Sequence, residues 1–118
     1  MIVWNNMDTL AAYRELRNTK AVDLAAAMSG EAGADRVRNY SAPICEGLAF
    51  NYGARPVDEQ ILESLAKLAE ESKLIEKYAA LYNGEVINTG ENRRVLHHLT
   101  RGQLGESVVA DSVDKRTF

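Results

Sequence analysis

The sequence predicts a mainly α-helical domain with one small β-hairpin, an α+β fold, and two observations support this. Apolar residues recur every three or four positions from Val57 to Ala69, which is typical of an amphipathic helix. On either side of "CEG" at 45–47, apolar residues alternate with other residues, which is typical of a two-stranded hairpin. With 118 residues, 46% of them hydrophobic and 26% charged, the chain has the composition of one globular domain.

The first two predicted helices are short. Asp8 can cap a helix whose apolar residues recur three apart, so we expect a helix over residues 8–18. The alanine-rich segment "AVDLAAAMS" at 21–29 favours a second helix. The two glycines of "SGEAGAD" at 29–35 then predict a surface turn.

The expected hairpin follows this turn. Its alternating apolar residues are Tyr40, Ala42 and Ile44 in the first strand and Leu48, Phe50 and Tyr52 in the second. Pro43 has no N–H to donate, so the first strand should be short or lie at an edge. Because two strands alone are marginal in water, we expect them to lean on helices.

Three further helices are expected after the hairpin. The first carries an apolar stripe of Ile61, Leu62, Leu65, Leu68 and Ala69, and the second a stripe of Leu74, Ile75, Tyr78 and Leu81. Asn83-Gly84 is a common stop for the second helix. The third should begin between Asn88 and Glu91 and run through Leu99. Residues 103–118 show little periodicity and predict an extended or loose tail.

Composition argues against several classes of function. The net charge of -3 and pI near 5.4 give no basic footprint, which argues against a nucleic-acid binder. No apolar run approaches the roughly 20 residues of a membrane span, and "MIVWNNMD" lacks a secretory pattern. The single cysteine, Cys45, excludes an intrachain disulfide and a multi-cysteine zinc cluster, so a reducing cytoplasm is the default compartment. Beside an acidic residue, its thiol is expected to pack rather than react.

The stretch "NGEVINTGENRRVLHHLTRG" at 83–102 concentrates the side chains that could carry chemistry. Neighbours in a helix point about 100° apart, so His97 and His98 cannot ligate one metal from the same face. Asn88 followed by Glu91 fits a capping box, which accounts for both residues without a function. The sequence therefore predicts neither a metal site nor a self-sufficient active site here.

In the same predicted helix, three residues at spacings of four form a cationic, imidazole-bearing face: Arg93, His97 and Arg101. One interpretation is a contact with an anion, a phosphate or a partner subunit through arginine. The other is a face that is solvated or tied to carboxylates elsewhere in the fold. The pattern leaves both open.

The stretch "GEVINTGENRRVLHHLTR" resembles the N-terminal signature of the glucose-6-phosphate isomerase (phosphoglucose isomerase) family, roughly G-E-x-I-N-x-T-E-x-R-A-V-L-H-x-A-L-R. The matches, in register and without a gap, are Gly84, Glu85, Ile87, Asn88, Glu91, Arg93, Val95, Leu96, His97 and Arg101. Departures are Gly90 for the family's threonine, Arg94 for its alanine, and Leu99-Thr100 for its Ala-Leu. Upstream, "FNYGARPVDEQILESLAKLAEES" is similar to the strand and helix that precede the signature.

This resemblance implies that residues 1–118 form one N-terminal helical segment of a larger sugar-isomerase α/β/α enzyme, whose catalytic domains follow it. The parent would interconvert glucose 6-phosphate and fructose 6-phosphate in the cytoplasm, through ring opening and a cis-enediol. It would need no cofactor and would act as a homodimer, without nucleic-acid or membrane partners.

The family's catalytic residues lie downstream of the signature, so the resemblance implies that this segment is inactive by itself. The signature residues would then be structural: Gly84, Glu85, Asn88, Glu91, Arg93, His97 and Arg101. A stand-alone helical module that binds a partner protein is the alternative.

Overall fold

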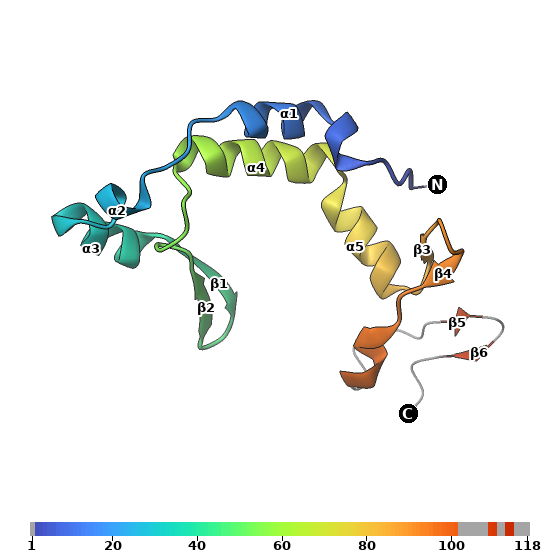
Figure 1. Ribbon diagram of the computed structural model, residues 1–118. Helices are drawn as coiled ribbons and strands as arrows, with labels where there is room; N and C mark the ends of the chain where they lie inside the picture. Colours follow the sequence, from blue (N-terminus) through green and yellow to red (C-terminus); the bar gives the residue numbers. More distant parts are fainter. Residues whose placement is uncertain (1, 102–108, 111–112, 115–118) are drawn as a thin grey trace. The chain divides into compact units, whose positions relative to one another are not determined.

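A computed structural model describes residues 2–101, 109–110 and 113–114 (Figure 1). The chain divides into two compact units: a central unit, Arg14–Ala66, and a terminal unit that combines Met1–Tyr13 with Lys67–Phe118. The described helices are η1 (Met7–Thr9), α1 (Ala11–Asn18), α2 (Leu24–Ala27), α3 (Gly30–Asn39), α4 (Glu59–Glu71), α5 (Leu74–Tyr82) and η2 (His97–Arg101). The strands are β1 (Ser41–Cys45), β2 (Leu48–Asn51), β3 (Val86–Asn88), β4 (Arg93–Arg94), β5 (Val109–Ala110) and β6 (Val113–Asp114).

The fold class is confirmed, since helices dominate and the strands form small antiparallel pairs. The first predicted helix is present as α1, preceded by the 3-10 turn η1 that contains Asp8. The second is present as the four-residue α2, which Asp23 caps by accepting a hydrogen bond from the Ala26 N–H at 3.1 Å.

The surface turn predicted at 29–35 is wrong, because α3 begins at Gly30. Gly33 lies inside this helix and is buried against the backbone of Met28. A Cβ at Gly33 would lie 2.1 Å from the Met28 carbonyl oxygen, a distance that no side chain permits. Here the glycine allows close approach of two backbone segments instead of forming a surface turn.

The hairpin is confirmed as β1 and β2, which pair with Ser41 opposite Asn51 and Pro43 opposite Ala49. Gly47 closes the connecting turn at φ +75°, a conformation that favours glycine. Every residue of both strands is exposed. The expected packing of the strands against helices is therefore not seen along their length.

Arg36 of α3 holds the segment that leads out of the hairpin. Its Nε donates to the Gly53 carbonyl at 3.1 Å, and its Nη2 donates to the carbonyls of Arg55 and Val57 at 3.0 and 2.8 Å. The guanidinium carbon also lies 4.3 Å from the centre of the Tyr40 ring, a cation–π distance. One side chain therefore fixes three backbone carbonyls within the central unit.

The first two of the three helices expected after the hairpin are confirmed by α4 and α5. Asp58 caps α4 through the Ile61 N–H at 2.8 Å. Buried apolar residues gather in the terminal unit: Leu10, Ala12, Leu68, Ala80 and Leu99. Part of the α5 stripe is not covered, since Leu74, Ile75 and Tyr78 are exposed.

The helix predicted from Asn88 through Leu99 is wrong. β3 and β4 form an antiparallel pair across residues 89–92, and only His97–Arg101 forms a short 3-10 helix. The sequence "NTGEN" at 88–92 is poor in helix-forming residues, and Asn92 adopts a left-handed φ of 52°. Local side-chain hydrogen bonds to the backbone therefore outweigh the helical period of the apolar residues that follow.

Most of the predicted loose tail, 103–118, lies outside the described residues. The part that is described consists of β5 and β6, which pair with Val109 opposite Asp114.

Candidate functional site

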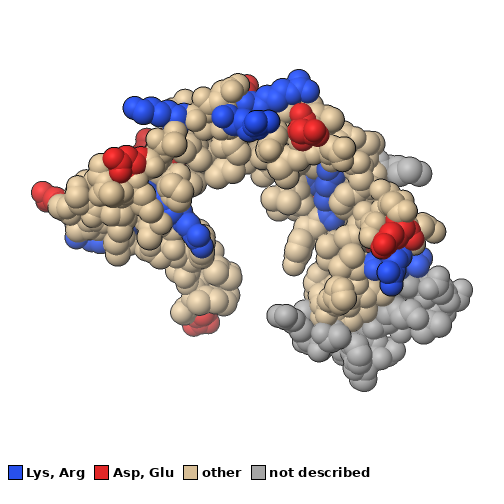
Figure 2. Space-filling view, viewed as in Figure 1, with Lys and Arg blue, Asp and Glu red and all other residues tan. Residues whose placement is uncertain are grey.

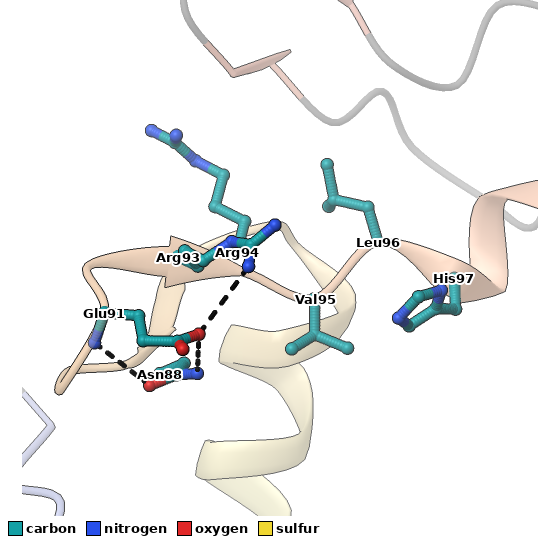
Figure 3. A pocket seen from close by; sticks show the side chains of 7 residues that line it. All are labelled: Asn88, Glu91, Arg93, Arg94, Val95, Leu96 and His97. Carbon is teal, nitrogen blue, oxygen red and sulfur yellow. Dashed lines mark hydrogen bonds and ion pairs between the residues drawn. The ribbon is translucent and has the colours of Figure 1, made fainter.

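The turn between β3 and β4, together with the segment after it, lines an open surface hollow of about 510 Å³. Its lining comes from Asn88, Glu91, Arg93, Arg94, Val95, Leu96 and His97 (Figure 3). Four of the seven signature residues contribute, although the helix that was expected to bring them together is absent. The volume is within the usual range of small-ligand sites.

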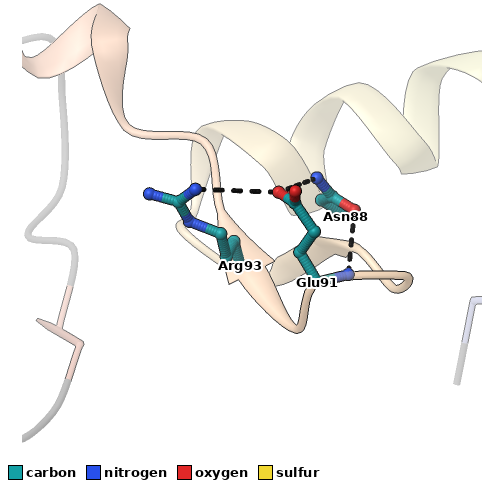
Figure 4. A network of polar contacts seen from close by, with 3 residues as sticks. All are labelled: Asn88, Glu91 and Arg93. Atoms are coloured by element: carbon teal, nitrogen blue, oxygen red, sulfur yellow. Dashed lines mark hydrogen bonds and ion pairs between the residues drawn. The ribbon is translucent and has the colours of Figure 1, made fainter.

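Asn88 and Glu91 exchange hydrogen bonds at the edge of this hollow (Figure 4). The Glu91 N–H donates to Asn88 Oδ1 at 3.2 Å, and Asn88 Nδ2 donates to Glu91 Oε2 at 3.0 Å. The predicted capping box is wrong as a helix cap, because no helix begins at Asn88. The pairing of these two residues instead closes the turn between two strands, as asparagine side chains commonly do.

Arg93 extends this network, with Nη1 3.7 Å from Glu91 Oε2 (Figure 4). Its side chain is 74% exposed and that of Glu91 62% exposed, so the ion pair contributes little to stability. The pair places one positive and one negative charge beside the hollow. An anion that bound here would meet the guanidinium and also the repulsion of Glu91.

Gly84 and Glu85 end α5 in a Schellman motif. The Gly84 N–H donates to the Leu81 carbonyl at 3.1 Å and the Glu85 N–H to the Ala80 carbonyl at 2.9 Å, with Gly84 at φ +78°. The predicted helix stop at Asn83-Gly84 is therefore confirmed. Arg94 Nε donates to the Gly84 carbonyl at 3.1 Å, which ties β4 to the end of α5.

His97 and His98 lie in different surroundings. His97 lines the hollow and is exposed, whereas His98 Nε2 lies 3.0 Å from the Tyr82 carbonyl oxygen and its ring stacks on Tyr82 at 4.8 Å. Because a carbonyl oxygen only accepts, Nε2 carries a proton. The predicted helix face of Arg93, His97 and Arg101 is not formed, because Arg93 lies in a strand and only the other two residues lie in η2. The Arg101 side chain is outside the part of the chain that the structure describes.

A second hollow, of about 430 Å³, is more apolar. It is lined by Ile2, Val3, Trp4, Glu85, Val86 and Thr89. The Nζ atom of Lys77 lies 5.5 Å from the centre of the Trp4 ring, so Trp4 contacts α5 within the terminal unit.

The arrangement around the turn suits anchoring better than proton transfer. The Glu91 carboxylate already accepts from Asn88 and faces Arg93, and it is exposed to water. Within the described part of the chain, His, Cys, Asp and Glu nowhere form a group of three or more that could hold a metal ion. The sequence analysis did not predict the carbonyl contacts of Arg36 and Arg94, because they depend on turns that a periodic pattern does not reveal.

Charged side chains of both signs are interspersed on the face shown in Figure 2, with wide uncharged areas between them. Among the described residues, each helix is too short or too polar to span a lipid bilayer.

A family model described as phosphoglucose isomerase matches residues 51–117. The glucose-6-phosphate isomerase of Treponema denticola is 45% identical over 98% of this chain and 23% of its own length. That of Treponema pallidum (strain Nichols) is 46% identical over 91% of this chain and 20% of its own length, and that of Borreliella burgdorferi (strain B31) is 35% identical over 95% and 21%.

The chain spans about a fifth of the length of the curated relatives that it matches. The family model covers more than half of the chain, and it includes the hollow, the Schellman motif and all seven signature residues. The chain therefore belongs to the phosphoglucose isomerase family.

Proposed function

We propose that the complete protein interconverts glucose 6-phosphate and fructose 6-phosphate, and that residues 1–118 are its N-terminal segment. The observation that carries this proposal is the 45% identity over nearly the whole chain to a relative named glucose-6-phosphate isomerase. The protein would act in the cytoplasm on a sugar phosphate as a homodimer, without a cofactor and without nucleic-acid or membrane partners.

The chemistry of an aldose–ketose isomerase assigns this segment a supporting role. Moving a proton between two carbons needs a positioned base near neutrality and donors for the developing oxyanion. The Glu91 carboxylate, which lines the hollow beside the β3–β4 turn, is instead held by Asn88 next to the Arg93 guanidinium. The segment contributes no catalytic group, and the base comes from domains that follow it.

The seven signature residues then act as structural anchors. Gly84 and Glu85 end α5, and Asn88, Glu91 and Arg93 shape the turn that follows. His97 and Arg101 belong to η2, which follows β4 in the chain. Together they hold the segment in the position that the catalytic domains require.

The test is an isomerase assay on two proteins, the complete protein and the isolated chain of residues 1–118. Formation of glucose 6-phosphate from fructose 6-phosphate is followed by coupling to a dehydrogenase that is specific for glucose 6-phosphate. We expect turnover by the complete protein and none by the isolated chain. No turnover by a folded complete protein contradicts the proposed activity, whereas turnover by the isolated chain contradicts the supporting role.

A further inference from the structure

The β1–β2 hairpin lacks the cover that a two-stranded sheet needs. Such a sheet is marginal in water, yet every residue of both strands is exposed. Its largest apolar side chains, Ile44, Leu48 and Phe50, are 61%, 54% and 49% exposed. Exposed large apolar side chains on an uncovered sheet are typical of an interaction site.

One face of the hairpin carries a row of aromatic rings. Tyr40 and Tyr52 stack across the strands at 5.2 Å, and Phe50 continues the row at 6.3 Å from Tyr52. The row begins at its base, where Arg36 packs on the half-buried Tyr40, and reaches the exposed Phe50. The face is therefore anchored at one end and uncovered at the other.

The hydrogen-bonding register determines what the outer edge of β2 offers. The Tyr52 N–H donates to the Tyr40 carbonyl at 2.8 Å, which makes these two residues a hydrogen-bonded pair. In an antiparallel ladder such pairs alternate with pairs whose peptide groups point outward. Ala49 and Asn51 belong to the second kind, so their N–H and C=O groups face away from β1.

The outer edge of β1 is less suited to pairing. The residues opposite Ala49 and Asn51 are Pro43 and Ser41, which also point their peptide groups outward. Pro43 has no N–H, so this edge lacks one of the two donors that an added strand would use. The two edges of the hairpin are thus chemically unequal, and only the β2 edge is complete.

We propose that a β-strand from the remaining polypeptide of the same protein pairs with the outer edge of β2 at Ala49 and Asn51, and covers Phe50. This rests on the proposed function, in which residues 1–118 are one segment of a longer enzyme. The relatives are several times longer than this chain, so the strand can come from the same molecule at high effective concentration. Strand addition of this kind satisfies the backbone through hydrogen bonds and the apolar face through side chains.

The test compares two proline substitutions in the complete protein. Ala49→Pro removes an outward N–H from β2, and Ser41→Pro, the matched control, removes one from β1. In the unsubstituted protein, the Ala49 and Asn51 amides should exchange hydrogen on the order of 100-fold more slowly than in an unstructured peptide. Ala49→Pro should speed exchange at Asn51 by roughly 10-fold or more, and Ser41→Pro by less than about 2-fold.

Several results would overturn the proposal. Exchange at Ala49 and Asn51 near the unstructured rate, or equal effects of the two substitutions, would show that no strand pairs there. Protection that disappears on dilution to a monomer would assign the edge to a second copy of the chain. If both variants fail to fold, exchange in the unsubstituted protein decides alone. Isomerase turnover, measured on the same samples, tests the proposed function separately.

Discussion

The carboxylate of Glu71, at the end of α4, caps the first turn of α1 at Ala12. Glu71 Oε2 accepts the Ala12 N–H at 2.7 Å, and Oε1 accepts the neighbouring Ala11 N–H at 3.0 Å. The first turn of α1 contains no acidic residue of its own. A side chain 59 residues away in sequence therefore satisfies two free N–H groups and complements the helix dipole.

Removing this long-range cap should destabilise the protein. We expect Glu71→Ala to lower the free energy of unfolding by about 1 kcal/mol, as the loss of a helix cap does. Glu71→Gln, which keeps one acceptor oxygen, should cost less. Urea unfolding of the complete protein measures the effect, and Glu70→Ala on the same helix is the control. Equal losses at Glu70 and Glu71 would contradict the cap.

The Arg36 contacts predict that lysine cannot replace this arginine. Lysine lacks the forked geometry that reaches the carbonyls of Gly53, Arg55 and Val57. We expect Arg36→Lys to lower the free energy of unfolding by about 2 kcal/mol, given hydrogen bonds from a charged donor. Arg38→Lys on the same helix is the matched control, because Arg38 is exposed and pairs with Asp35.

That control should change stability by less than about 0.5 kcal/mol, as exposed ion pairs do. Thermal and urea unfolding should agree on the ranking. If Arg38→Lys costs as much as Arg36→Lys, the carbonyl contacts of Arg36 do not stabilise the central unit.

The turn between β3 and β4 should depend on Asn88 more than on its neighbours. Asn88→Ala removes both hydrogen bonds to Glu91, and we expect a loss of about 1 kcal/mol. Thr89→Ala, in the same turn, is the control and should be nearly neutral. Backbone chemical shifts of residues 86–94 should report two strands; helical shifts from Asn88 onward would contradict the described turn.

Arg93 should matter for position and not for proton transfer. Its guanidinium is mostly exposed and 3.7 Å from Glu91, so we expect Arg93→Lys to change stability by less than about 0.5 kcal/mol. In the complete protein, kcat at saturating substrate and its pH profile should be unchanged. A large fall in kcat without a loss of folded protein would instead place Arg93 among the groups that contact substrate.

The contact of His98 with Tyr82 predicts one tautomer of the imidazole. With Nε2–H donating to the Tyr82 carbonyl, Nδ1 is the unprotonated nitrogen of the neutral ring, and it is a buried atom without a hydrogen-bond partner in the described residues. Nitrogen chemical shifts of the ring should identify this form. His98→Phe, which keeps the stacked ring, should cost less than His98→Ala; the reverse order would mean that stacking on Tyr82 contributes nothing.

Elements with a long, unbroken period were predictable from sequence. The α4 stripe spans three turns and begins at a cap, Asp58, so its pattern has no competing interpretation. The β1–β2 hairpin was equally clear, because alternation continues on both sides of Gly47. In both cases the residues that form the local sequence pattern are the residues that form the element in the structure.

Predictions failed where a residue's role depends on a distant or unusual contact. Gly33 was expected to lie in a surface turn, but it fits against Met28 inside a helix. Asn88 and Glu91 have the spacing of a capping box, and the same spacing closes a turn between strands. The hollow could not be predicted from the sequence, because its lining residues are brought together by this turn between strands and not by the face of a helix.

The central unit is formed by one continuous stretch of sequence, whereas the terminal unit combines two separate stretches. This difference affects the order in which the units can form during synthesis. The central unit is one continuous stretch, Arg14–Ala66, and Arg36 reaches only as far as Val57. The terminal unit cannot form until residues beyond Lys67 emerge from the ribosome to meet the first thirteen. Chains fold as they are made, from the N-terminus onward. We therefore expect α3 and the hairpin to form before Glu71 is available to cap α1.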